Sequence, residues 1–258
     1  TGVKNPRSFT YDELQAMPQV TKRATLQCLV TGSAGHNIYN AEWTGVPISY
    51  LVEQCGGLED GVNVVGADAW DGWVNAGMKL PVHEYLDEGI VALKVNGEDL
   101  PYDLGGPMRL VLPGIGGGQN TNWVKTIAFS HVDGEPTDPI KETFPNLPGD
   151  ELNPVSAAWF ANDGVTFSLK DGVDLKGYAF AYAMHMDSPL AAIEFSTDYG
   201  KSWQRFDVPE GNDPYQWATF NFHWDPPAAG TYVIKVHGVN TEGLASETDA
   251  GIIVKVTE

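Results

Sequence analysis

Cys28 is the residue whose type and setting most directly suggest chemistry. It lies near the end of the apolar run ATLQCLV at 24–30, which predicts a buried strand, and the loop TGSAGHN follows it. A thiol at the end of a strand can be reached by a ligand, and its thiolate is a nucleophile and a metal ligand. The competing interpretation is an inert core thiol, because free cysteine is among the most buried residue types. The residues around Cys28 leave both interpretations open.

A second candidate is the glycine-rich segment GIGGGQNTNW at 114–123. Successive backbone N–H groups in such a turn can hold an anion without a basic side chain. Gly116–Gly118 would supply these groups, and Asn120, Thr121, Asn122 and Lys125 would supply polar side chains. The alternative is a tight connection between two strands, and the pattern allows either.

Composition excludes two classes of partner. The 258 residues include 15 basic and 34 acidic side chains, a net charge of -19, which would repel nucleic acid and anionic membrane surfaces. No apolar run approaches the roughly 20 residues that a membrane-spanning helix needs, so we expect no membrane insertion. The second cysteine, Cys55, follows apolar residues at helical spacing and precedes Gly-Gly, which predicts a packed core thiol at a helix end.

The abrupt opening TGVKNP is typical of the end of a strand and a turn. We expect that a leader and some domain sequence have been removed, which favours an exported, periplasmic or other extracytoplasmic protein over a cytoplasmic one.

The elements that would position these residues fall into two parts. Residues 1 to about 130 alternate between helix-like and strand-like segments, whereas period-two alternation dominates after residue 154. The fold class is therefore α+β, with a mixed α/β domain at 1–135, a proline-rich linker at 136–154 and an immunoglobulin-like β-sandwich at 155–258. We predict helices at 11–17, 46–54 and 80–87, and strands at 24–30, 62–68, 90–95, 108–114, 124–130, 165–170, 177–184, 190–198, 217–224, 231–239 and 251–256.

Several blocks in order resemble the sulfite oxidase family. FTYDEL at 9–14, TLQC at 25–28 and AEWTGVPI at 41–48 are similar to the family's opening pattern. VNVVGAD, VALKVNGEDLPYDLGGPMRLVLPG and GGGQNTNWVKTI are similar to its later blocks. IEFSTDYGKSWQRFDV and WDPPAAGTYVIKVHGVNTEG resemble its Mo-cofactor dimerisation domain. The resemblance covers nearly the whole chain.

The resemblance implies a molybdopterin-binding oxidoreductase domain and a set of site residues. Cys28 matches the cysteine that ligates molybdenum, Asp68 matches a residue of the cofactor pocket, and Arg109 matches the arginine of the P-x-R block. The implied cofactor is molybdopterin carrying molybdenum, and the implied reaction is oxygen-atom transfer with two-electron redox. The cofactor supplies that reactivity, while the protein supplies orientation and electrostatics.

Departures from the family pattern change the expected substrate. The family reads A-G-N-R-R after its cysteine, but LVTGSAGHN follows Cys28, so the arginine that faces sulfite is missing. Leu104 replaces a pocket histidine, and Asn122 replaces the lysine of V-K-W. We therefore expect a substrate other than sulfite. Asn120, Thr121, Asn122, Lys125 or the amides at 116–118 would remake the cofactor contacts.

The alternative is a degenerate, cofactor-free member that serves as a binding or interaction protein, which the same replacements favour. Two further alternatives are another metal on Cys28 and His36, or sulfite oxidation through a rebuilt anion site. His36, Trp70, Trp73 and His83 flank the pocket in the family, although half-buried structural roles explain them equally. The expected partners are a small-molecule substrate, an external electron acceptor, because no haem-binding motif is present, and a second copy of the chain through the C-terminal domain.

Overall fold

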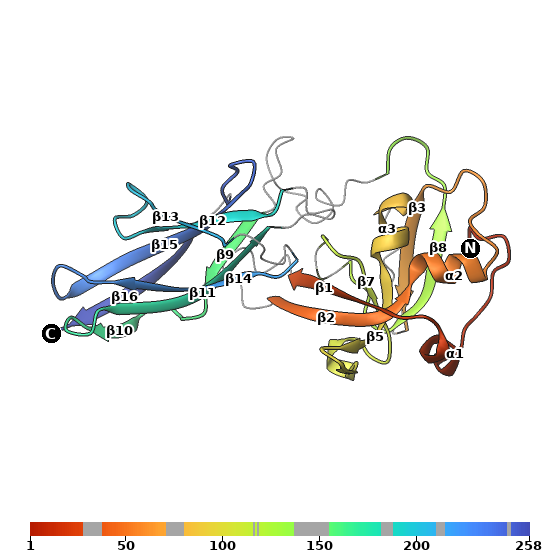
Figure 1. The fold of residues 1–258 in the computed structure, drawn as a ribbon, viewed down its shortest axis with the longest axis horizontal. Helices are drawn as coiled ribbons and strands as arrows, with labels where there is room; N and C mark the ends of the chain where they lie inside the picture. The colour runs from red at the N-terminus through yellow and green to blue at the C-terminus, as the bar shows by residue number, and fades with distance from the viewer. Residues whose placement is uncertain are drawn as a thin grey trace. The chain divides into compact units, whose positions relative to one another are not determined.

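The computed structural model describes residues 1–27, 38–70, 80–115, 117, 119–136, 155–181, 188–209, 215–246 and 249–258. The described residues form two compact units (Figure 1). Unit 1 contains residues 1–27 and 39–136, and unit 2 contains Ile38 and residues 155–258. Most of the expected linker, 137–154, lies outside the described residues.

Unit 1 contains the three predicted helices, which are α1 (Tyr11–Ala16), α2 (Ile48–Gln54) and α3 (Val82–Glu88). The 3-10 turn η2 (Tyr102–Leu104) was not predicted. In α1, the Thr10 hydroxyl accepts from the Glu13 N–H at 3.2 Å, and the Glu13 carboxylate accepts from the Thr10 N–H at 2.7 Å, which closes a capping box. The predicted helices at 46–54 and 80–87 both begin two residues late, because a strand ends at Pro47 and another at Pro81. No helix in the described part of the chain has the length and apolar character needed to cross a membrane.

Two sheets form the framework of unit 1. The larger follows the order β1-β2-β5-β6, with β7 also paired to β5, and the smaller follows β4-β3-β8. The larger sheet contains β1 (Val20–Gln27), β2 (Ile38–Pro47), β5 (Ile90–Val95), β6 (Glu98–Asp99) and β7 (Arg109–Val111). The smaller contains β3 (Val64–Ala69), β4 (Leu80–Pro81) and β8 (Val124–Ser130).

Strand β2 is absent from the sequence prediction. The alternation that is typical of a strand covers only a few residues here: Ala41 and Trp43 are buried, and Glu42 between them is exposed. A register shift at Gly45 follows, and a Cβ at this position would overlap the carbonyl oxygen of Val91. Only glycine therefore allows β2 to approach β5 this closely.

An apolar cluster covers one face of the larger sheet. Tyr39 and Leu104 pack against its edge. Its buried members come from β1, β2, β5, β7 and the turn before η2, and they are Ala24, Leu26, Ala41, Trp43, Ile90, Ala92, Val95, Leu100 and Val111. Because Arg109 lies opposite Ala92 in the β7–β5 pair, the arginine side chain leaves the sheet on this apolar face.

Asn120, which is 1% exposed, holds the loop that follows β7 through hydrogen bonds to the loop's own backbone. The Asn120 side-chain oxygen accepts from the Leu112 N–H at 2.6 Å, and its amide nitrogen donates to the Ile115 carbonyl at 3.4 Å. The Leu110 N–H donates to the Thr121 carbonyl at 2.9 Å. A buried side-chain amide therefore replaces sheet pairing in this segment.

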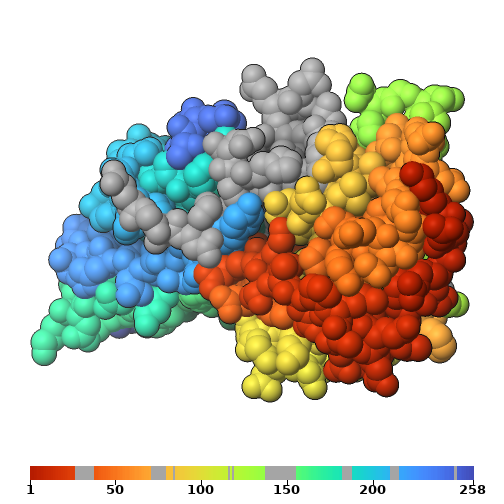
Figure 2. Space-filling model, turned by 45° about the vertical axis from the view of Figure 1, so that its right-hand side comes forward, coloured from red at the N-terminus to blue at the C-terminus, as the bar shows by residue number. Residues whose placement is uncertain are grey.

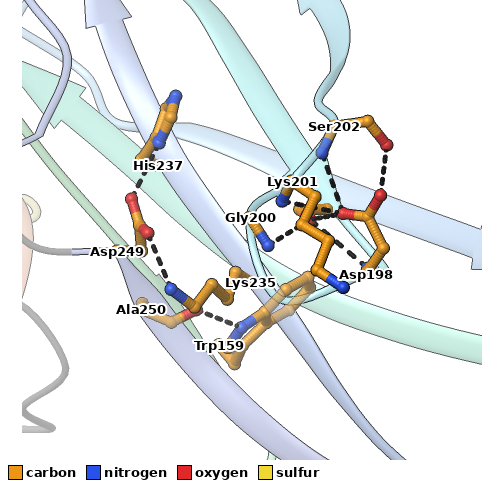
Figure 3. Close-up of polar contacts among 10 residues, drawn as sticks. Trp159, Asp198, Gly200, Lys201, Ser202, Lys235, His237, Asp249 and Ala250 are labelled. Carbon is orange, nitrogen blue, oxygen red and sulfur yellow. Dashed lines mark hydrogen bonds and ion pairs between the residues drawn. The ribbon is translucent and has the colours of Figure 1, made fainter.

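Unit 2 consists of two sheets that share one core. Trp159 comes from one sheet, and its indole N–H donates to the Ala250 carbonyl of the other at 2.9 Å (Figure 3). The first sheet has the order β14-β11-β9 and the second β10-β16-β15-β12-β13. The bounds are β9 (Val155–Trp159), β10 (Val165–Ser168), β11 (Val173–Ala181), β12 (Leu190–Ser196), β13 (Gln204–Asp207), β14 (Ala218–Trp224), β15 (Gly230–Asn240) and β16 (Ala250–Thr257).

The six strands predicted in this region correspond to β10, β11, β12, β14, β15 and β16. β9 and β13 were not predicted. Every residue of β9 is buried and every residue of β13 is exposed. Neither strand therefore shows the alternation of buried and exposed residues on which the prediction depended.

Asp198 organises the turn between β12 and β13. Its carboxylate accepts from the backbone N–H groups of Lys201 at 3.0 Å and Ser202 at 2.9 Å, and from the hydroxyls of Ser202 at 2.6 Å and Ser196 at 2.8 Å (Figure 3). These hydrogen bonds, led by those from Ser202, lower the pKa of Asp198 to about 2.

Replacing Asp198 with Asn should destabilise the protein in a pH-dependent way. An amide lacks the second acceptor oxygen, so the variant should have a lower melting temperature than the parent at pH 7. The carboxylate's contribution is present above its unfolded pKa of about 4 and is lost as the pH falls to about 2. Melting curves across this range should show the two proteins converging. Asp171→Asn is the matched control, since that exposed carboxylate accepts no hydrogen bond from a described residue, and a gap that stays constant with pH would contradict the assignment.

Asn120→Ala should lower the free energy of unfolding by about 1–3 kcal/mol, because it leaves the buried Leu112 N–H without its acceptor. Urea denaturation would measure this loss. Asn5→Ala, at an exposed asparagine, should change stability by less than about 0.5 kcal/mol. Equal effects at the two positions would show that Asn120 does not hold the loop.

Candidate functional site

Arg109 is a buried cation that lacks a carboxylate partner among the described residues. The residue is 5% exposed, and its Nη1 donates to the Tyr39 hydroxyl at 2.7 Å and to the Leu104 carbonyl at 3.0 Å. Its Nε is buried and has no hydrogen-bond partner in the described part of the chain. Burial lowers the pKa of Arg109, and contact with Tyr39 opposes that shift. Because an unpaired buried charge is costly, the surroundings of Arg109 favour an anionic or acceptor ligand.

Trp43 forms one wall beside this cation. The Trp43 side chain is fully buried, and the Arg109 Cζ lies 5.5 Å from its ring centroid, within the range of a cation–π interaction. The Tyr39 and Trp43 rings are 6.0 Å apart. Since Tyr39, Ala41 and Trp43 alternate along β2, all three lie on the sheet face that carries Arg109.

Asn122 brings a second unpaired polar atom to the turn after η2. Its Oδ1 is buried without a partner among the described residues. A Cβ on Gly105 would lie 2.6 Å from this oxygen, and Gly105 has φ +95°, so the close approach depends on glycine. The Trp123 N–H donates to the Gly105 carbonyl at 3.0 Å. Arg109 and Asn122 therefore both contact the two-residue turn formed by Leu104 and Gly105.

Asp68 lies on a strand that joins the same region. It is half-buried on β3, opposite Thr126 of β8, and a register shift follows it directly. Two residues later, the Trp70 N–H donates to the Trp123 carbonyl at 2.9 Å. Backbone hydrogen bonds therefore connect the end of β3, through Trp123, to the turn that Arg109 contacts.

The remaining predicted residues are placed differently. The side chain of Asn120 bonds to the backbone of its own loop, and Thr121 is 2% exposed in the same loop. Lys125 is exposed, and its Nζ lies 5.7 Å from the ring of Trp70, which is 77% exposed. His83 is exposed on α3. Cys28, His36, Trp73, Gly116 and Gly118 lie outside the described residues, and Gln27 at the end of β1 is the last residue described before Cys28.

No group of three or more His, Cys, Asp or Glu side chains within the described ranges could hold a metal ion. The predicted metal ligand, Cys28, is not among the residues to which this finding applies.

A cavity of about 260 Å³ lies in another part of unit 1. The N-terminal segment, red in Figure 2, lies on the surface of unit 1 and lines part of this cavity. α2 and β8 supply further walls, and Cys55, which is 7% exposed, faces it. Arg109, Tyr39 and Asn122 do not line this cavity, whereas Lys125, which the sequence offered as a cofactor contact, does.

Sequence reasoning missed Tyr39 as a site residue. The alternation of Tyr39, Ala41 and Trp43 would have identified β2 and placed both aromatic rings on one face. Their contact with Arg109 could not be read from the sequence, because it depends on β2 and β7 pairing with the two edges of β5.

Residues 1–137 match the family model described as the oxidoreductase molybdopterin binding domain. The chain is 27% identical over 248 residues to a nitrate reductase [NADPH] of Aspergillus niger, an alignment that covers 80% of this chain and 28% of the relative. It is 26% identical over 253 residues to the mitochondrial sulfite oxidase of Homo sapiens, which covers 82% of this chain and 45% of the relative. The chain thus spans less than half the length of these curated relatives.

A solved structure shows the same fold over most of the chain. The sulfane dehydrogenase SoxCD from Paracoccus pantotrophus superposes with a TM-score of 0.72 at 20% sequence identity, and the match covers 96% of this chain and 67% of that chain. The chain belongs to the sulfite oxidase family of molybdopterin oxidoreductases, and its first 137 residues are the oxidoreductase molybdopterin binding domain.

Proposed function

We propose that unit 1 binds the molybdenum cofactor and that the chain is an oxidoreductase acting on a substrate other than sulfite. The observation that carries the proposal is the Arg109 guanidinium, which is buried without a carboxylate and has an unpaired Nε. The unpaired Asn122 oxygen borders the same turn. A ligand with both an anionic oxygen and an N–H donor would satisfy the two atoms, and a phosphorylated pterin has both.

Each site residue has a role in this proposal. Cys28 would supply a thiolate to the metal, Arg109 would donate to an anionic oxygen, and Asn122 would accept from a ring N–H. Asp68 would border the pocket from β3, and Asn120 and Thr121 would shape the loop beside it. When bound, the cofactor supplies two-electron redox and oxygen-atom transfer.

The apolar surroundings of Leu104 bear on the substrate. Leu104 packs against the cluster that contains Trp43, at the position where the family has a histidine. Without this histidine and the lysine that Asn122 replaces, the site has less positive charge to attract a small dianion such as sulfite. The same packing favours the second candidate, a cofactor-free member that uses the pocket only for binding.

Maturation in a host that makes the cofactor should separate these two candidates. We expect purified protein to contain molybdenum by elemental analysis and to release the fluorescent oxidised pterin. Arg109→Gln should reduce the recovered pterin by about tenfold or more, since a hydrogen bond to a charged group is worth about 1.5–3 kcal/mol.

Arg205→Gln is the matched control, because Arg205 is an exposed arginine of unit 2. Cys28→Ser should leave the fold intact and abolish turnover, since an oxygen ligand alters the metal's electronics. Parent protein that contains neither molybdenum nor pterin would refute the enzyme and favour the cofactor-free alternative.

We also propose that unit 2, after a linker at 136–154, is an immunoglobulin-like dimerisation domain and that electrons leave to an external acceptor. The two sheets of unit 2 around one core support the first part of this proposal. Light scattering should give about twice the 28.0 kDa mass of the chain. A monomer at micromolar concentration would contradict the dimer.

A further inference from the structure

The hydrogen bonds of Arg109 leave one edge of its guanidinium without a described partner. Nη1 is held twice, by the Tyr39 hydroxyl and the Leu104 carbonyl. Neither Nε nor Nη2 forms a hydrogen bond with a described residue, and Nε is fully buried. In the planar guanidinium, Nε–H and one Nη2–H point in parallel along the side opposite Nη1, the geometry that pairs with two oxygens of one oxyanion.

Tyr39 helps to fix the orientation of the Arg109 guanidinium. Because arginine has no acceptor, the 2.7 Å bond must run from Arg109 Nη1 to the Tyr39 oxygen. The carbonyl of Leu104 alone would leave the guanidinium free to pivot about one contact. Two acceptors on Nη1, with the Trp43 ring 5.5 Å from Cζ, fix both the edge and the plane.

We infer that Tyr39 is a positioning residue that fixes the orientation of the Arg109 guanidinium, so that its Nε–Nη2 edge binds one oxyanion group through two hydrogen bonds. The inference rests on the proposed function, because it concerns the same site around Arg109. To that function it adds Tyr39 and a geometry for binding the anion. The recognised chemistry is a phosphate or carboxylate oxygen pair, whether on a cofactor or on a free ligand.

The chain is suited to a direct test, because it has four arginines: Arg7, Arg23, Arg109 and Arg205. Protein produced in a host without cofactor synthesis and labelled with ¹⁵N-arginine would give four Nε–H signals, and Arg109→Lys would assign one of them. Titration with sodium phosphate at constant ionic strength, with sodium chloride as the reference salt, should shift the Arg109 signal selectively.

Tyr39→Phe removes the hydroxyl acceptor and keeps the ring against Trp43. We expect about a tenfold weaker phosphate affinity at Arg109 and faster exchange of its Nε–H with water. Tyr102→Phe is the matched control, since Tyr102 is 72% exposed, and it should leave both values unchanged. Equal phosphate affinity in the parent and Tyr39→Phe would overturn the inference.

A measurement on the parent covers the case in which Tyr39→Phe does not fold. A guanidinium held through Nη1 rotates slowly about the Nε–Cζ bond, so Arg109 should give separate Nη1 and Nη2 signals. Averaged Nη signals for Arg109 would overturn the inference. The outcome is independent of the molybdenum measurement, because it uses protein without cofactor. If parent protein matured in a cofactor-making host contains no molybdenum, while cofactor-free protein binds phosphate through Arg109, the enzyme is refuted and the role of Tyr39 stands.

Discussion

The burial of a guanidinium against an apolar sheet face is the constraint on which the site in unit 1 depends. Arg109 follows Met108 into a strand of three buried residues and lies opposite Ala92, so its side chain must enter the Trp43 cluster. Nothing acidic in the described residues neutralises it. The protein instead surrounds the charge with neutral acceptors, the Tyr39 hydroxyl and the Leu104 carbonyl, and with an aromatic face. Neutral acceptors stabilise the cation without cancelling its charge, so its attraction for an anion is retained.

The surrounding backbone is built to keep this arrangement in place. Gly45 allows β2 to approach β5, which brings Tyr39 and Trp43 to the correct face. Gly105 allows Asn122 to pack against the turn whose carbonyl holds Arg109. Asn120 secures the loop that follows β7. Each of these positions requires a glycine or a buried amide, and each supports the backbone around Arg109.

The buried cation of Arg109 stands out in a chain with a large net negative charge. A net charge of -19 would keep anions away from most of the surface. A buried cation can still bind an anionic group that contacts it, because this short-range interaction occurs at a lower dielectric than the interactions between surface charges. In the proposed function, Arg109 would be the residue that holds one anionic group of the ligand.

The sequence by itself determined the family and most of the elements, because ordered blocks such as TLQC and GGPMRLVLPG and the alternation in the second half are local patterns. It identified Arg109, Asp68 and Asn122 as site candidates. It could not show that the side chain of Asn120 bonds its own loop, or that Tyr39, 70 residues from Arg109, holds the guanidinium. These features depend on how β2 and β7 pair with β5 and on where the loop after β7 folds back. Only the tertiary structure decides such contacts, because strand pairing joins residues that share no local pattern.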